Sequence, residues 1–424
     1  MSKRSAEEEN VCSFFLSRKK KPCRMKTQDG MSFCPHHSHL DTEQDPVKGI
    51  RIPCPFDPSH FCYESKLQKH LKKCNAREKE KPEYYVENIN LDLESSKKSK
   101  LSLNDVSDEE LLELIKRVET LYESLDIVTS ETTSMHPTLE REMEVTDDGL
   151  NTFKHLKQQG SLLEVMEKQN FLKNSSCFVE FGAGKGQLMY WIIKCASDAE
   201  NTAFILVDRS AQRHKSDNKF KGTEILLQRI RIDIQHLHLG KIPTLKDKLN
   251  RVVGVSKHLC GAATDLAIKC MANTLEQDSD GAKVKLKAFG LLMALCCHHR
   301  CSWDSYIGKQ YFENFKLSER EFQLLCCMAS WATCGLRKTA LEHHSETTAK
   351  ENEEIPEDNV LNRYKKLNLS HEEREVIGMK CKRLIDAGRV LYLQKEGYEV
   401  ELITYTDKSV SLENVALLAT HKES

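Results

Sequence analysis

The stretch FVEFGAGKGQL, residues 178–188, decides the fold of this chain. An apolar run leads into Gly182, Gly184 and Gly186, and a helical pattern follows directly after them. Glycines in such a turn let the backbone approach a ligand closely, and the N-terminus of the following helix favours a nearby anion. The turn is not a P-loop, because no Ser or Thr follows its lysine, and it lacks the G-x-G-x-x-G spacing of dinucleotide-binding turns.

Short apolar runs alternate with helical or mixed segments from residue 177 onward. This alternation is typical of an α/β domain with a largely parallel sheet. Ser370 and Glu373 mark the start of a further helix, because they have the spacing of a capping box. The expected strands are residues 177–181, 203–207, 252–255, 288–294, 398–405 and 414–420.

Three acidic residues accompany these strands. Glu180 stands before the first glycine in the pattern E-x-G-x-G-x-G of S-adenosylmethionine methyltransferases, where it can approach the methionine end of the cofactor. Asp208 ends the next strand, where a carboxylate accepts hydrogen bonds from both ribose hydroxyls. Asp233 is placed to lie beside the adenine, although a surface aspartate after a strand is common. The sequence therefore predicts a Rossmann-like S-adenosylmethionine methyltransferase domain with these cofactor-binding residues: Glu180, Gly182, Gly184, Gly186, Asp208 and Asp233.

Two further segments follow strands at the end of the sheet where open α/β sheets bind substrates. The segment SKHLCGAATD, residues 256–265, carries Lys257, His258 and Cys260. The run CCHHRC, residues 296–301, is a candidate for a third metal site, but adjacent ligands fit a tetrahedron poorly. We expect this run to form a wall of the substrate pocket, with buried reduced thiols as the alternative.

Two Cys/His sets near the N-terminus have the composition of tetrahedral zinc sites. The first set lies within residues 10–40 and the second within residues 50–76. Modules this short gain much of their stability from the metal, so two structural zinc ions are predicted. The first set, C-x10-C-x10-C-x2-H, consists of Cys12, Cys23, Cys34 and His37, with His36 and His39 as competitors for the fourth position. The second, C-x5-H-x9-H-x3-C, consists of Cys54, His60, His70 and Cys74.

The nearly neutral total charge hides an asymmetry along the chain. The 424 residues carry 63 Lys and Arg against 64 Asp and Glu, but residues 11–82 carry 15 against 8, and residues 76–148 carry 9 against 20. A basic head with interspersed aromatic residues suits a phosphate backbone and unstacked bases, so RNA or DNA binding is expected there. The alternative is that the aromatic residues form the cores of the zinc modules and the lysines an ordinary surface.

The acidic residues 77–148 are interpreted as a linker that precedes a methyltransferase domain at residues 149–424. Within the linker, Ser107 and Glu110 have capping-box spacing and precede apolar residues at helical intervals. We expect an amphipathic helix that packs on its own protein. A short coiled coil is the alternative, although two heptads fall short of what a coiled coil needs. The polar stretch near residues 339–368 is interpreted as a surface insertion.

The compartment is indicated by what the sequence lacks. It has no run of about 18 apolar residues and begins with a charged segment, so we expect an intracellular protein of the nucleus and/or cytoplasm, without a membrane span. A reducing compartment keeps most of the 17 cysteines unpaired. Nothing in the sequence indicates an obligate protein partner.

The order of these motifs resembles that of the eukaryotic tRNA 2'-O-methyltransferases that modify nucleotide four of the acceptor stem, with the human-type members as the nearest match. The resemblance covers nearly the whole chain. It rests on the CCCH and CHHC sets and on the segments EFGAGKG, SKHLCGAATD, ALCCHHRCSW, DAGR (386–389) and EN (413–414).

The resemblance implies transfer of a methyl group from S-adenosylmethionine to a ribose 2'-hydroxyl in the acceptor stem of tRNA. A ribose hydroxyl is weakly acidic, so a nearby base or cation helps it to lose its proton. Lys257 is expected to stabilise the developing alkoxide or to act as the base, and His258 to take the proton or to orient the ribose. Alternatively, both residues only bind phosphate or hold the loop.

Two other functions stay open on the sequence. One is a zinc-finger RNA-binding or scaffold protein with a degenerate methyltransferase fold, which the intact glycine turn and Asp208 disfavour. The other is a base methyltransferase. No Asn-Pro-Pro-Tyr motif follows residues 252–255, which disfavours methylation of exocyclic amines, whereas pyrimidine methylation through Cys260 or Cys296 remains open.

Overall fold

The chain divides into two compact units, Met1–Pro82 and Glu83–Ser424, and each has a fold of its own. The boundary lies well before the predicted start of the methyltransferase domain at residue 149. The computed structural model describes residues 11–16, 21–23, 25–27, 32–34, 37, 51–74, 77, 80–91, 101–125, 129–145, 150–173, 176–196, 202–212, 215–246, 251–273, 287–334 and 363–421.

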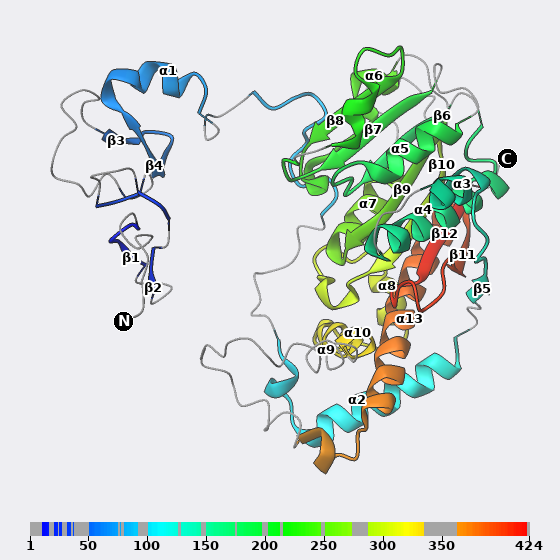
Figure 1. The fold of residues 1–424 in the computed structure, drawn as a ribbon. Helices are drawn as coiled ribbons and strands as arrows, with labels where there is room; N and C mark the ends of the chain where they lie inside the picture. The colour runs from blue at the N-terminus through cyan, green and yellow to red at the C-terminus, as the bar shows by residue number, and fades with distance from the viewer. Residues whose placement is uncertain are drawn as a thin grey trace, which may run out of the picture. The chain divides into compact units, whose positions relative to one another are not determined.

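The larger unit is built on one eight-stranded sheet, with the strand order β5-β11-β12-β10-β9-β6-β7-β8 (Figure 1). The strands from β8 to β10 pair in parallel, β12 runs antiparallel to both of its neighbours, and β5 is parallel to β11. The parallel strands have the 3-2-1-4-5 order of a Rossmann-like sheet, which confirms the predicted fold class. The strands are β5 (Thr129–Glu131), β6 (Ser176–Phe181), β7 (Ala203–Asp208), β8 (Leu226–Arg231), β9 (Arg251–Cys260), β10 (Lys287–Cys296), β11 (Tyr398–Thr404) and β12 (Val415–His421).

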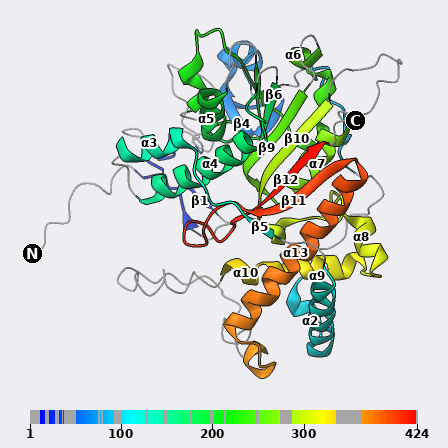
Figure 2. The ribbon, with the colours of Figure 1, turned by 90° about the vertical axis from the view of Figure 1, so that its right-hand side faces the viewer.

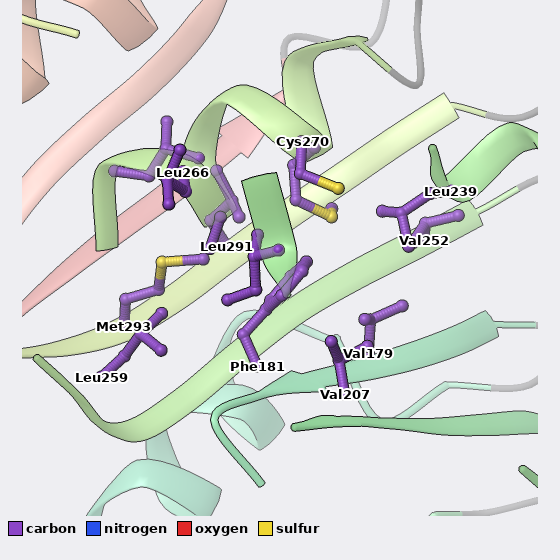
Figure 3. Close-up of a cluster of buried hydrophobic side chains, with 14 of the residues drawn as sticks. Val179, Phe181, Val207, Leu239, Val252, Leu259, Leu266, Cys270, Leu291 and Met293 are labelled. Carbon is purple, nitrogen blue, oxygen red and sulfur yellow. The ribbon is translucent and has the colours of Figure 1, made fainter. Parts of the chain in front are cut away.

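Helices cover both faces of this sheet (Figure 2). One face packs against α3 (Pro137–Val145), α4 (Leu150–Lys168) and α5 (Gln187–Cys195). The other packs against α7 (Ala262–Ala272) and the C-terminal half of α13 (His371–Lys395). Successive strand residues point to opposite faces, so Val179 and Phe181 lie in the core of the second face, which Figure 3 shows.

A helical layer adjoins the sheet. Its core contains residues of α2 (Asp108–Glu123), α8 (Lys309–Asn314), α9 (Glu319–Ala329), α10 (Trp331–Cys334) and the N-terminal half of α13. The capping box predicted at Ser370 and Glu373 opens α13. Helix α2 buries Leu111, Leu114, Ile115 and Val118 in this layer, so it is an amphipathic helix packed on its own protein, and the structure gives the coiled-coil alternative no support.

The segment predicted as a linker contributes to the larger unit from Glu83 onward. Near its start, the side-chain amide of Asn90 donates to the carbonyls of Ile234 and Leu237, at 2.7 and 2.9 Å. Farther on, it supplies α2, β5 and α3. The acidic residues of this segment lie on the exposed faces of its helices, whereas most of the apolar residues of α2 are buried in the core of the larger unit. For this reason its acidic composition did not distinguish it from a linker.

The predicted polar insertion near residues 339–368 lies mostly outside the described residues. Its last part is described, and there Arg363 donates to Asp108 at 2.8 Å and to the carbonyls of Leu103 and Val106. The end of the insertion is therefore held against the start of α2.

The described residues of the smaller unit form two antiparallel strand pairs and one α-helix. β1 (Phe15–Leu16) pairs with β2 (Lys21–Pro22), and β3 (Arg51–Cys54) pairs with β4 (Asp57–Tyr63), which leads through η3 (Glu64–Lys66) into α1 (Leu67–Leu71). Across the described parts of both units, no helix is long and apolar enough to cross a membrane.

Candidate active site and zinc centres

The glycine turn follows β6 and lies against the end of β9. A Cβ atom on Gly182 would lie 2.9 Å from Leu259 Cδ1 and 3.2 Å from the carbonyl oxygen of His258, so only glycine packs here without a shift. A Cβ atom on Gly184 would meet nothing within 4 Å. Both have positive φ, +65° and +50°, which glycine adopts readily. Gly182 thus seats the turn on the protein, while Gly184 presents its backbone to open space, as a cofactor cradle requires.

Asp208 closes the turn from the neighbouring strand. Its Oδ2 accepts a hydrogen bond from the backbone N–H of Gly184 at 2.7 Å, and its Oδ1 accepts one from the N–H of Ser210 at 2.7 Å. The carboxylate is half-buried at the end of β7, beside the open side of the turn. Two of the residues predicted to bind the cofactor are therefore in direct contact.

Asp233 lies just after β8, one strand farther along. The N–H of Ile232 donates to the carbonyl of Asp208 at 3.2 Å, so Asp233 is held close to the same end of the sheet. Its side chain caps η6 (Ile234–His236), where it accepts from the N–H of Gln235, and it lies 3.6 Å from Arg209 Nη1. The structure thus gives this aspartate a capping role, and its place beside the adenine stays a prediction.

Glu180 is almost fully buried beneath the turn, with 4% of its surface exposed. It accepts a hydrogen bond from the N–H of Met189 at 3.1 Å. Burial raises the pKa of the Glu180 carboxyl to about 8, although the charges of Arg229 and Lys257 act in the opposite direction. A cationic ligand group beside it would favour the ionised form.

Arg229 braces the turn from β8, and sequence reasoning missed it. It donates through Nε and Nη2 to the two carboxylate oxygens of Asp217, at 3.0 and 2.9 Å, and through Nη1 to the carbonyl of Gly184 at 2.9 Å. Such a bidentate pair fixes the orientation of the guanidinium group. Neither residue belongs to a recognisable motif, so the sequence carried no signal for this contact.

Lys257 projects from β9 toward α4. Its Nζ lies 2.9 Å from His155 Nδ1 and 3.3 Å from Gln158 Oε1, two residues that sequence reasoning also missed. Burial lowers the pKa of Lys257, and the charge of Glu180 opposes this effect. Burial and the charge of Lys257 lower the pKa of His155. A cationic or proton-accepting amine is thus held near the glycine turn.

The side chain of His258 points toward Cys260 and not toward α4. Its Nε2 lies 3.3 Å from Cys260 Sγ, since side chains two residues apart on a strand lie on the same face and Lys257 lies on the opposite one. The structure also brings Cys296 and Cys297 to this point, and the four ligand atoms lie within 4.8 Å of one another. The two residues predicted to be catalytic therefore have different surroundings.

A fully buried ionic network stands behind this end of the sheet. Arg389 donates to both carboxylate oxygens of Asp265, at 3.0 and 2.7 Å, and to Asp386 at 3.1 Å. Asp386 also lies 2.7 Å from His298 Nε2. Burial lowers the pKa of His298 to about 4, despite the opposing charge of Asp386. The network links the SKHLCGAATD, CCHHRC and DAGR segments.

The first Cys/His set of the smaller unit comes together as predicted. His37 Nδ1 lies 3.4 Å from Cys12 Sγ and 3.4 Å from Cys34 Sγ, and Cys23 Sγ lies 3.9 Å from Cys34 Sγ. A tetrahedral zinc ion requires ligand separations of roughly 3.3–3.8 Å, from metal–ligand distances of about 2.0–2.3 Å. These residues fit zinc. The competing residues, His36 and His39, lie outside the described residues.

The second set also converges. His70 Nε2 lies 3.1 Å from Cys54 Sγ and 3.2 Å from His60 Nε2. Cys74 Sγ lies 3.6 Å from Cys54 Sγ and 3.4 Å from His60 Nε2. These separations also suit a tetrahedral zinc ion, with two ligands from the β3–β4 hairpin and two from α1 and the turn after it.

Models of known families match all three parts of the chain. Residues 10–38 match the CCCH zinc finger in TRM13 protein, and residues 51–75 match the U11-48K-like CHHC zinc finger. Residues 157–420, more than half of the chain, match the model of methyltransferase TRM13. This chain belongs to the TRM13 methyltransferase family.

Full-length relatives share the whole arrangement. The Homo sapiens "tRNA:m(4)X modification enzyme TRM13 homolog" is 39% identical over 98% of this TRM13 chain and 95% of the human protein. The Kluyveromyces lactis "tRNA:m(4)X modification enzyme TRM13" is 31% identical over 99% of this chain and 97% of its own length. A solved coclaurine N-methyltransferase is 12% identical, with a TM-score of 0.28, over 73% of this chain and 87% of its own.

The family and the geometry together define the cofactors. The S-adenosylmethionine-dependent methyltransferase fold, with the glycine cradle in place, supports S-adenosylmethionine as the methyl donor. The two zinc-finger matches and the converging ligands support zinc in the smaller unit.

Proposed function

We propose that this TRM13 protein transfers a methyl group from S-adenosylmethionine to a ribose 2'-hydroxyl in the acceptor stem of tRNA. The observation that carries the proposal is the position of the Lys257 amine, which the protein holds beside the glycine turn and against His155. The human and Kluyveromyces lactis relatives are named as tRNA modification enzymes, which supports tRNA as the substrate.

The cofactor site divides into parts with separate tasks. S-adenosylmethionine supplies an electrophilic methyl group. Gly184 and the half-buried carboxylate of Asp208 are placed to hold the ribose of the cofactor, and Asp233 lies on the adenine side. Glu180 is placed beneath the turn, where its carboxyl can bind the ammonium group of the methionine end. Arg229 keeps the turn in shape through Gly184 and Asp217.

Lys257 is the residue best placed for the attacking hydroxyl. A ribose hydroxyl needs help to lose its proton, and a positioned amine provides it either by stabilising the alkoxide or by accepting the proton. His155 and Gln158 restrict the amine to one region, which suits a positioned group. His258 stays as a second catalytic prediction, either as the proton acceptor or as a residue that orients the ribose.

The smaller unit is proposed as the tRNA-binding part. Four of its phenylalanines fall into two pairs. Phe14 and Phe33 pack on the thiols of the first zinc centre, whereas Phe15 and Phe56 are 56% and 46% exposed. Exposed rings beside lysines suit unstacked bases and a phosphate backbone, a use that core packing does not explain. The lysines of the described part are Lys21, Lys26, Lys66, Lys69, Lys72, Lys73 and Lys81.

An intracellular location, in the nucleus and/or cytoplasm, forms part of the proposal. None of the cysteines whose side chains are described forms a disulfide, which suits a reducing compartment.

The test is transfer of a tritiated methyl group to total unmodified tRNA, followed by nuclease digestion to locate the label. Label in an alkali-resistant linkage at the fourth nucleotide is the expected result, because 2'-O-methylation blocks cleavage of the neighbouring phosphodiester. Label on a base in an alkali-sensitive linkage would replace the ribose assignment with base methylation. Absence of transfer by a chain that binds both S-adenosylmethionine and tRNA would favour the scaffold function.

A further inference from the structure

A second group of soft ligands lies in the larger unit, outside both zinc fingers. We propose that His258, Cys260, Cys296 and Cys297 bind a third zinc ion at the ends of β9 and β10. Their four ligand atoms, one imidazole nitrogen and three sulfurs, lie within 4.8 Å of one another. Neither zinc-finger family model reaches these residues, since the models end at residues 38 and 75.

The sheet register brings two of the thiols together. Strands β9 and β10 are parallel neighbours, and Cys260 pairs directly with Cys296 at the last position of both strands. The N–H of Gly261 donates to the carbonyl of Cys296 at 3.4 Å, which continues the contact one residue beyond the strands. His258 and Cys260, two residues apart on one strand, lie on the same face. The register shifts by one residue between Ser256 and Leu259, so His258 lies at an irregularity of β9, whereas Cys260 and Cys296 are placed by the regular pairing that follows.

The fourth ligand depends on an unusual backbone. Cys297 has φ 52° and ψ 43°, the left-handed conformation that residues other than glycine rarely adopt. In a continued strand Cys297 would point to the face opposite Cys296. The left-handed turn brings its sulfur back to the cluster instead, and its N–H donates to Glu413 Oε1 at 3.3 Å. This turn removes the objection that adjacent cysteines fit a tetrahedron poorly.

The thiol–imidazole separation in this cluster matches those in the two zinc fingers of the same chain. His258 Nε2 and Cys260 Sγ are 3.3 Å apart, against 3.4 Å for the Cys12 and His37 atoms of the first finger and 3.1 Å for Cys54 and His70 in the second. A tetrahedral zinc ion requires roughly 3.5 Å between a thiolate and an imidazole ligand. A Cys3His donor set selects zinc through its soft thiolates and fills all four positions.

The other nearby cysteine does not belong to the set. Cys301 lies 3.1 Å from Arg389 Nη2 and contacts the buried ionic network, so the CCHHRC run serves two different sites. The metal set is therefore limited to the first two cysteines of that run together with His258 and Cys260.

A zinc ion here would hold the substrate end of the sheet together. It would tie β9 to β10 directly beside Lys257 and behind Gly182, whose Cβ position lies 3.2 Å from the His258 carbonyl. With four protein ligands it has no open position, so it orders the site and does not activate a substrate. His258 as a ligand is not available as a proton acceptor, which leaves Lys257 as the positioned group for the proposed reaction. The metal site itself does not depend on that reaction.

The decisive measurement is the zinc content of the full chain, by native mass spectrometry and by elemental analysis under reducing conditions. We expect three zinc ions per chain, one for each of the three ligand groups. A finger-null variant, with Cys23→Ser, Cys34→Ser, Cys54→Ser and Cys74→Ser, should retain one ion. Because it leaves the larger unit unaltered, this variant tests the site even if changes in the site itself prevent folding. Two ions in the wild type and none in the finger-null variant would overturn the proposal.

Substitutions in the site assign the remaining ion. In the finger-null background, Cys260→Ser should reduce the zinc content from one ion per chain to none, and Cys195→Ser, which changes a half-buried free thiol on α5, should leave it at one. With cobalt in place of zinc, thiolate-to-metal charge-transfer absorption should be present in the background variant and absent after Cys260→Ser. An ion that persists after Cys260→Ser lies elsewhere and would contradict the assignment.

Discussion

The carboxylate of Asp208 and the backbone N–H of Gly184 are 2.7 Å apart, so the last residue of β7 closes the glycine turn that follows β6. The aspartate that is predicted to bind the ribose of the cofactor therefore also shapes the glycine turn. Asp208 has a second acceptor oxygen on the N–H of Ser210, which holds the carboxylate in place. The two hydrogen bonds therefore fix the orientation of the Asp208 carboxylate before any cofactor binds.

Asp208→Ala should weaken S-adenosylmethionine binding by roughly 10- to 100-fold, since hydrogen bonds to a charged group contribute about 1.5–3 kcal/mol. Isothermal titration calorimetry on the full chain measures the effect. Asp407→Ala removes an exposed aspartate that accepts from the N–H of Ser409 and should leave the affinity unchanged. Equal affinities for the wild type and Asp208→Ala would remove the ribose-binding role.

The buried carboxyl of Glu180 predicts a pH dependence of stability. Its pKa rises from 4.5 in the unfolded chain to about 8 in the folded one, so the folded state prefers the protonated form. Its favourable contribution is complete below pH 4.5 and is lost as the pH rises through 8. The urea midpoint of the cofactor-free wild type should therefore fall as the pH rises from 4.5 to about 8. The urea midpoint of Glu180→Gln should fall less over the same pH range. Parallel curves for the two proteins would show that Glu180 does not titrate there.

Lys257→Ala should lower kcat by roughly 10²- to 10⁴-fold with little change in the affinity for S-adenosylmethionine, because the amine acts on the acceptor hydroxyl. Gln158→Ala removes only one of its neighbours and should have a smaller effect. Single-turnover methylation of tRNA separates the chemical step from binding. If Lys257→Ala raises KM for tRNA and leaves kcat intact, the lysine binds phosphate only.

Arg389→Leu should destabilise the larger unit by about 3–5 kcal/mol, because it leaves the buried carboxylate of Asp265 without its cation and removes one of the two arginines that pair with Asp386. Arg320→Leu breaks an ion pair with Glu110 in which both side chains are exposed, and should change stability little. Urea unfolding followed by tryptophan fluorescence suits the comparison, since Trp191, Trp303 and Trp331 all lie in the larger unit. Similar decreases in the free energy of unfolding for both variants would contradict a larger contribution of the buried network to stability.

Cys54→Ser should release zinc from the second finger and weaken tRNA binding, while S-adenosylmethionine binding stays intact, because the cofactor residues lie in the other unit. Filter binding at fixed salt and calorimetry measure the two affinities. Cys62→Ser changes a buried thiol of the same hairpin that is not one of the four predicted ligands and serves as the control. Undiminished tRNA binding after loss of the metal would exclude the finger as a tRNA-binding module.

Much of this architecture was predictable, because its signals are local in the sequence. The glycine turn, the zinc spacings and the capping box of α13 each fit within a few dozen residues. The contacts that were missed join distant residues: Arg229 to Gly184, Lys257 to His155, and Arg389 to Asp265. The left-handed backbone at Cys297 depends on tertiary contacts such as that with Glu413, so no strand pattern indicates it. In a regular strand the side chains of Cys296 and Cys297 would point to opposite faces. In this structure both sulfur atoms lie in the same cluster.

The short strand β5 protects the sheet against unwanted pairing. Without it, β11 would be the outermost strand and would offer unpaired backbone groups to other chains, a common route to aggregation. β5 covers Leu402, Ile403 and Thr404 and ends in Glu131, which is exposed. A charged strand of three residues is a poor template for further strands. Truncation at residue 149 would remove β5 and expose this hydrogen-bonding edge, so a fragment of the larger unit should keep the residues from Glu83 onward.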